Sequence, residues 1–181
     1  MKKYLFSIFF LMFSIINYGQ GCSDAGICSV GNSFHNVDKE TKNNLEIGSV
    51  FGGGEADISY FSPYITYTRI FSKRFAMSTK VTYSSADGSL GNISQFGDGY
   101  LIGNYQWKSE KTAKWSTLFG LKFPFTNSNQ KIKGNALPLA YQSSLGTIDL
   151  IVGTNLNYKK WDFNVGLQFP AINNNRNAYF K

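Results

Sequence analysis

The sequence predicts an all-β protein, an antiparallel up-and-down transmembrane β-barrel, to which this chain contributes about seven strands. Three observations support the prediction. Residues 161–170 alternate between large apolar and small or polar side chains, the pattern of a strand with one apolar and one polar face. The alternation recurs along the chain, in segments of roughly the ten residues that a tilted strand needs to cross a bilayer. The chain also begins like an exported protein.

Residues 1–21 are predicted to be a signal peptide. Lys2 and Lys3 precede a short apolar run at 4–16, and small or polar residues suited to cleavage follow. The alternative is a retained N-terminal anchor. No later stretch of the sequence approaches the roughly 18 apolar residues of a transmembrane helix. Contact with a membrane is therefore expected through strands.

Composition agrees with an exported membrane protein. Aromatic residues make up 17% of the chain and charged residues only 16%, and membrane barrels use aromatic girdles at both interfaces. The net charge of +7 could favour nucleic acid. The basic residues fall at predicted turns rather than on one face, so we expect the lipid bilayer, and not nucleic acid, as the partner.

Residues 22–43 are predicted to form an N-terminal clip and a polar lead-in. Cys22 and Cys28 are a disulfide candidate, because an exported protein meets an oxidising compartment. Lipidation of Cys22 is the alternative, although Tyr-Gly-Gln-Gly lacks the apolar start of a lipobox. No metal site is expected, because two thiols are an incomplete ligand set and the single histidine, His35, lies in the polar lead-in.

Residues 44–181 are predicted to form the barrel domain. Its strands are justified by apolar residues that recur at alternate positions: Leu45, Ile47 and Phe51 in 45–51; Phe75, Met77, Val81 and Tyr83 in 75–83; Leu101, Tyr105 and Trp107 in 98–107; Phe119, Leu121 and Phe123 in 115–123; Ile148, Leu150, Val152, Leu156 and Tyr158 in 147–158; and the odd positions of 161–170. The remaining strand, 58–71, has ambiguous faces, and Pro63 interrupts it.

The predicted links alternate in length. Short links lie around Lys73, at 108–114 and at 159–160, whereas long links lie at 52–57, 84–97 and 126–146. Outer-membrane barrels have this arrangement, with short periplasmic turns and longer extracellular loops. Aromatic residues such as Trp107, Trp115 and Tyr158 fall at strand ends on the apolar face, where girdles belong. A soluble exported sandwich with aromatic core caps is the alternative.

The polar face supplies the candidate lumen-facing residues. They are Lys80, Asp98, Asn104, Lys122, Asp149, Asn155, Asp162 and Asn164. The three aspartates could act as paired acids, but lumen charges balanced by the two lysines are the preferred interpretation. We predict no enzyme activity and no cofactor. A lipid-modifying enzyme remains a third alternative and would require His35 to reach a hydroxyl or carboxylate near the lipid face.

Three short segments carry a family resemblance. Phe96-Gly97-Asp98-Gly99-Tyr100, Gly120-Leu121-Lys122-Phe123-Pro124 and Leu145-Gly146-Thr147-Ile148-Asp149 with Gly153 resemble landmarks of outer-membrane barrels of the meta-pathway phenol-degradation-like, or fatty-acid and aromatic-hydrocarbon transporter-like, group. The start at 20–26 and the Asn-, Lys- and Phe-rich composition are similar to members from Bacteroidota. Phe125-Thr126 stands where that group has Thr-Gly, and no substrate residue can be carried over.

The resemblance implies a barrel in the outer membrane of a Gram-negative bacterium that takes up small apolar compounds. The expected function is a passive transporter or channel for small molecules, a class that could include hydrophobic or aromatic compounds. The alternative is a structural or adhesive surface barrel that binds partners through its long loops. Because bacterial barrels normally have an even strand count, we expect this chain to be a fragment lacking several further strands, and its own strands to form an open, curled sheet.

Overall fold

The structure is a computed structural model that describes residues 41–53, 57–109 and 112–179. The predicted signal peptide, the Cys22–Cys28 pair and His35 lie outside the described residues. The described part is all-β, and it holds no helix long and apolar enough to cross a membrane.

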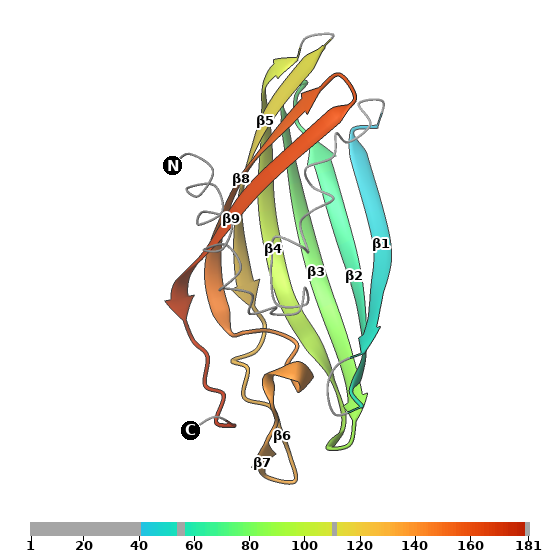
Figure 1. Ribbon diagram of the computed structural model, residues 1–181, viewed down its shortest axis with the longest axis vertical. Coiled ribbons are helices and arrows are strands. Elements are labelled where there is room, and N and C mark those ends of the chain that lie inside the picture. Colours follow the sequence, from blue (N-terminus) through green and yellow to red (C-terminus); the bar gives the residue numbers. More distant parts are fainter. Residues whose placement is uncertain (1–40, 54–56, 110–111, 180–181) are drawn as a thin grey trace, which may run out of the picture.

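The fold is one antiparallel sheet of seven strands with the order β1-β2-β3-β4-β5-β8-β9 (Figure 1). The strands are β1 (Asn43–Gly53), β2 (Ser59–Ile70), β3 (Phe75–Gly88), β4 (Gly91–Ser109), β5 (Ala113–Pro124), β8 (Thr147–Tyr158) and β9 (Trp161–Asn173). Each strand of this sheet pairs with the next strand of the sheet along the chain, so that β5 pairs with β8. This is the up-and-down topology that the alternating pattern predicted.

The predicted long link at 84–97 is wrong. β3 and β4 run straight through it, with Ser84 opposite Gln95 and Gly88 opposite Gly91, and only two residues form the turn. The φ of Gly91 is +123°, a backbone conformation that glycine adopts without strain. The sequence predicts a loop here because most side chains are small or polar, and Ile93 and Phe96 lie on opposite faces, so the apolar alternation is lost although the ladder continues.

Pro63 lies inside β2 without ending it. It faces Ser49 of β1, and the β2–β3 ladder skips Pro63 and Ser62 beside it, although the Ser62 hydroxyl donates to that of Ser84 on β3. Because proline has no N–H to give to a ladder, the sheet accommodates it with this local gap in the β2–β3 pairing. The exposure of its side chains shows which face of β2 is which: Phe61, Ile65 and Tyr67 are exposed with the other apolar side chains.

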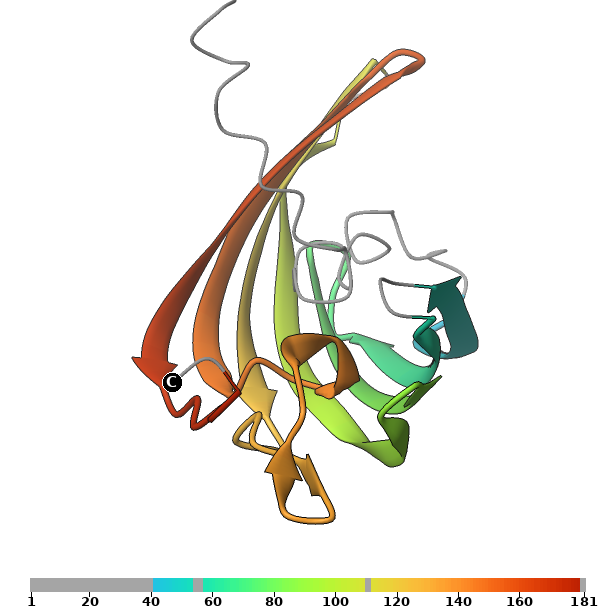
Figure 2. The ribbon, with the colours of Figure 1, turned by 60° about the horizontal axis from the view of Figure 1, so that its bottom comes forward.

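The sheet curls across its width but does not close into a barrel (Figure 2). Among the described residues, β1 pairs only with β2 and β9 only with β8. The expected open, curled sheet is therefore confirmed. Two short turns, 71–74 and 159–160, lie at one end of the sheet together with the end of β4 at Ser109 and the start of β5 at Ala113, and this end is called here the turn end. The opposite end is called the loop end.

The link between β5 and β8 has structure of its own at the loop end. It contains a small hairpin of β6 (Lys131–Ile132) and β7 (Asn135–Ala136), followed by the 3-10 turn η2 (Leu139–Tyr141). Tyr141 and Leu137 pack with Ile58 and Ala86 in a small buried cluster. Ala86 lies on the polar face of β3, so the link folds back over the loop end of that face.

The chain after β9 also packs against this link. The side-chain oxygens of Asn173, Asn175 and Asn177 each accept a hydrogen bond from the backbone N–H two residues later. The side-chain amide of Asn175 donates to the carbonyl of Leu145, and that of Asn177 donates to the carbonyl of Ser128. These asparagines form a ribbon of successive Asx turns that hold the link in place.

Candidate functional site

One face of the sheet is apolar and exposed. Its side chains include Phe119, Leu121, Val152, Val165 and Leu167, whose exposed fractions run from 43% to 62%. They come from the positions at which the sequence alternation placed apolar residues. A soluble sheet buries such a face, so this arrangement is the reverse of that in a soluble protein.

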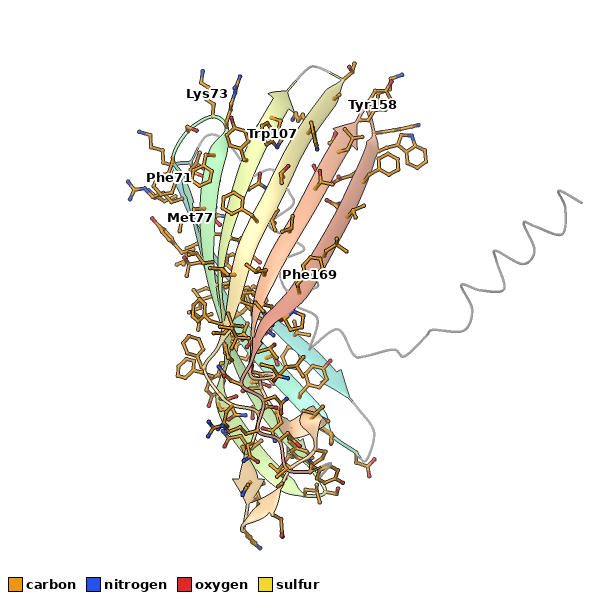
Figure 3. The ribbon with its side chains drawn as sticks, turned by 90° about the vertical axis from the view of Figure 1, so that its left-hand side faces the viewer. Phe71, Lys73, Met77, Trp107, Tyr158 and Phe169 are labelled. Carbon is orange, nitrogen blue, oxygen red and sulfur yellow. The ribbon has the colours of Figure 1, made fainter. Side chains whose placement is uncertain are left out.

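Aromatic side chains form two bands on this apolar face. The turn-end band contains Trp107 and Trp115, whose rings lie 6.1 Å apart, and Trp161, whose ring lies 6.2 Å from that of Phe163. Each of the indole N–H groups of Trp107 and Trp115 donates to a threonine hydroxyl, at 2.8 Å. Figure 3 shows Trp107 and Tyr158 near this end and Phe169 farther down the sheet.

The loop-end band contains Tyr83, Phe96, Phe123 and Phe125, whose rings meet edge to face. Phe96 and Trp107 belong to the two bands and lie eleven positions apart on β4, one of which is taken up by the bulge opposite Val81 and Tyr83. At about 3.3 Å per residue and a tilt of about 40°, the bands are about 25 Å apart along a barrel axis. That is the height of the apolar band of outer-membrane barrels, which is about 25 Å.

The opposite face, called here the polar face, is much less exposed, because the curl of the sheet brings its side chains together. It mixes buried polar side chains with one buried apolar cluster of Tyr100, Ile102, Leu118 and Ile151. Lys80, Asp98, Lys122, Asp149 and Asn155 are all buried on it. Lys122 and Asp149 form an ion pair at 3.0 Å, with side-chain exposures of only 1% and 3%. The predicted pairing of lysines with lumen carboxylates is thus realised at this pair.

Neighbouring polar groups complete the environment of the ion pair. The ammonium of Lys122 also donates to the hydroxyl of Thr147, at 3.3 Å, and the side-chain amide of Gln168 donates to Asp149. Thr147 and Gln168 were not among the predicted lumen-facing residues. Their positions on β8 and β9 share the parity of Asp149 and Asp162, a signal that could have identified them.

Lys80 has a different neighbour. Its ammonium lies 4.0 Å from the centroid of the Tyr64 ring, and the Tyr64 hydroxyl donates to Glu46 at 2.9 Å. A cation over an aromatic face is attracted by the ring electrons. Tyr64 was missed because the faces of β2 could not be read from the sequence. Glu46 lies on β1, where the alternation did place it opposite the apolar side chains, but it was not among the predicted lumen-facing residues.

The remaining predicted residues share the polar face but differ in burial. Asn104 is half-buried on β4, whereas Asp162 and Asn164 are exposed on the outer strand β9. The side-chain amide of Asn155 donates to both Asp162 and Asn164, the latter at 2.8 Å. The aspartates therefore serve as acceptors for different partners, and Asp98 accepts from Ser144 of the β5–β8 link.

Two glycines on β4 allow the phenylalanines of β5 to pack closely. Gly99 faces Phe123 and Gly103 faces Phe119 across the β4–β5 pair. A Cβ atom added at Gly103 would lie 2.4 Å from the Phe119 ring, and one added at Gly99 would lie 2.2 Å from the Phe123 ring. The rings therefore cover the bare backbone of the neighbouring strand, and any side chain there would displace them.

Across residues 41–53, 57–109 and 112–179, no group of three or more His, Cys, Asp or Glu side chains could hold a metal ion. Comparisons with protein-family models, with curated proteins and with solved structures found no match to this chain.

Proposed function

We propose that this chain forms the wall of an outer-membrane β-barrel that lets small molecules pass without catalysis. One observation carries the proposal: the apolar side chains of the sheet are exposed, while an ion pair and several amides are buried on the opposite face. Lipid can cover the first face, and water or a solute can contact the second. The resemblance to uptake barrels in three short segments agrees with this role.

The proposal requires the edges of β1 and β9 to be paired in the membrane. An unpaired backbone N–H or C=O group in hydrocarbon costs several kcal/mol. The two edges therefore have to be paired either with each other or with other strands. In either case the side chains of Lys80, Lys122, Asp149 and Asn155 line the inside.

A second candidate is a structural or adhesive surface barrel that binds partners through its loops. The observation in its favour is the β5–β8 link, which packs over the loop end of the polar face through Tyr141 and Ser144. A link that remains there would narrow passage. The same link, held by the Asx-turn ribbon, would present a fixed surface to a partner.

Liposome swelling distinguishes the two candidates. The full chain, purified and refolded into vesicles, is mixed with solutes of graded size and polarity. A passive channel is expected to accelerate swelling for small solutes, with a cut-off in size, relative to protein-free vesicles. Protein that is inserted, as shown by protection from protease, but leaves swelling at the rate of empty vesicles would contradict transport and favour the second candidate.

A further inference from the structure

Basic side chains gather at the turn end of the sheet. The exposed cations there are Lys42, Arg69, Lys73, Arg74, Lys114, Lys159 and Lys160. The sequence suggested that basic residues at turns are dispersed. The fold corrects this interpretation, because the turns at 71–74 and 159–160 and the β4–β5 connection lie at the same end and bring their lysines and arginines together. We call this set the basic collar.

Of the described acidic side chains, only Asp162, the second residue of β9, lies near the turn end. Asp57 and Asp87 are at the loop end, and Glu46, Asp98 and Asp149 are farther along the polar face. Among the described residues, the seven cations of the collar therefore outnumber the carboxylates at this end, and the collar carries net positive charge. Such a concentration of one sign creates a potential that attracts anions.

The collar is joined to the aromatic residues of the turn end. The guanidinium of Arg69 lies 5.4 Å from the centroid of the Phe71 ring, and the ammonium of Lys159 lies 5.3 Å from that of Tyr158. Figure 3 shows Lys73 at the same end of the sheet as Phe71, Trp107 and Tyr158. Aromatic rings favour the headgroup level, and long cationic side chains extend from there toward water.

We propose that the basic collar binds the phosphates of anionic phospholipids, and that the turn end therefore sits in a leaflet rich in them. This inference rests on the proposed membrane location. Phosphatidylglycerol supplies the matching chemistry, a phosphate with a net negative charge at the depth that the collar occupies. Each lysine or arginine close to such a surface raises local lipid association about fivefold, and salt screens the effect.

The tryptophans of the chain report on this end. The chain has three, Trp107, Trp115 and Trp161, and all lie in the turn-end band below the collar. Fluorescence of the full chain is measured in mixed vesicles in which either phosphatidylglycerol or phosphatidylcholine carries brominated acyl chains, which quench indoles on contact. At equal lipid fractions and low salt, brominated phosphatidylglycerol is expected to quench several-fold more efficiently than brominated phosphatidylcholine. In 0.5 M salt the two brominated lipids are expected to quench by a similar amount.

A matched pair of variants isolates the collar. Lys73→Gln, Lys159→Gln and Lys160→Gln together remove three collar charges. Lys131→Gln, Lys133→Gln and Arg176→Gln remove the same charge from exposed residues at the loop end. The first variant is expected to lose the preference for phosphatidylglycerol, and the second is expected to keep it.

The possible results test lipid binding by the collar separately from the membrane location. Equal quenching by both brominated lipids in the natural chain would overturn the proposal that the collar binds anionic lipid but leave the membrane location standing. Equal loss of preference in both variants would also overturn it, since net charge alone would then explain the effect. Absence of quenching by either lipid would overturn the membrane location itself.

Discussion

An arginine at Val165 tests whether the apolar face contacts lipid. Val165 is 62% exposed on β9 and lies four positions from both Trp161 and Phe169. Four residues at about 3.3 Å each, tilted by about 40°, correspond to about 10 Å of depth from either aromatic residue. Val165 is therefore near the middle of the proposed apolar band, where an arginine facing lipid costs about 2 to 4 kcal/mol.

Asn164→Arg is the matched control, because Asn164 is the adjacent residue at the same depth on the polar face. The substitution removes the hydrogen bond from Asn155, which contributes about 1 kcal/mol. Both variants are refolded into vesicles, and their free energies of unfolding are measured by urea titration of tryptophan fluorescence. Val165→Arg is expected to be the less stable by about 1 to 3 kcal/mol. Equal stability would refute the assignment of the apolar face to lipid.

Three further predictions concern packing and passage. Lys122→Met is expected to destabilise the sheet by about 3 to 5 kcal/mol, because it leaves the Asp149 carboxylate buried without its cation, and adding Asp149→Leu should recover most of the loss; urea unfolding that gives additive losses would contradict this. Gly103→Ala should cost about 1 to 3 kcal/mol in the same assay, because the facing phenyl ring must move, whereas Gly53→Ala, whose Cβ would have only an ordinary contact, should cost less. Tyr141→Ala should loosen the β5–β8 link and accelerate liposome swelling; an unchanged rate would mean that the link does not limit passage.

The sequence predicted the seven strands of the sheet because each has an apolar face that produces a period-two pattern. The same pattern correctly placed Lys122 and Asp149 on one face. It failed where that pattern is absent. At 84–97 most side chains are small or polar, and Ile93 and Phe96 lie on opposite faces, so the continued ladder of β3 and β4 left no period-two apolar signal. On β2, Tyr60 and Tyr64 on one face and Ile65 and Tyr67 on the other made the strand look apolar throughout.

Tertiary contacts account for the other omissions. The packing of Tyr141 against Ile58 and Ala86 joins segments far apart in the chain, and no local pattern indicates it. The basic collar likewise follows from the topology. Lys73 and Lys159 are far apart in the sequence, and they come to the same level of the sheet only because both of their turns lie at one end. Alternate asparagines at 173, 175 and 177 did carry a local signal, because each can accept a hydrogen bond from the N–H two residues on.

The number of strands fixes the relative direction of the two outer strands. In an antiparallel sheet of seven strands, the first and the last run the same way. If β1 and β9 met, their seam would be the one parallel ladder in a wall that is otherwise antiparallel, and parallel pairing is slightly less stable per residue. Such a seam would be the line along which the wall separates first. Backbone amides of Leu45 to Phe51 and of Phe163 to Phe169 would then exchange with deuterated water ahead of those in β4 and β5.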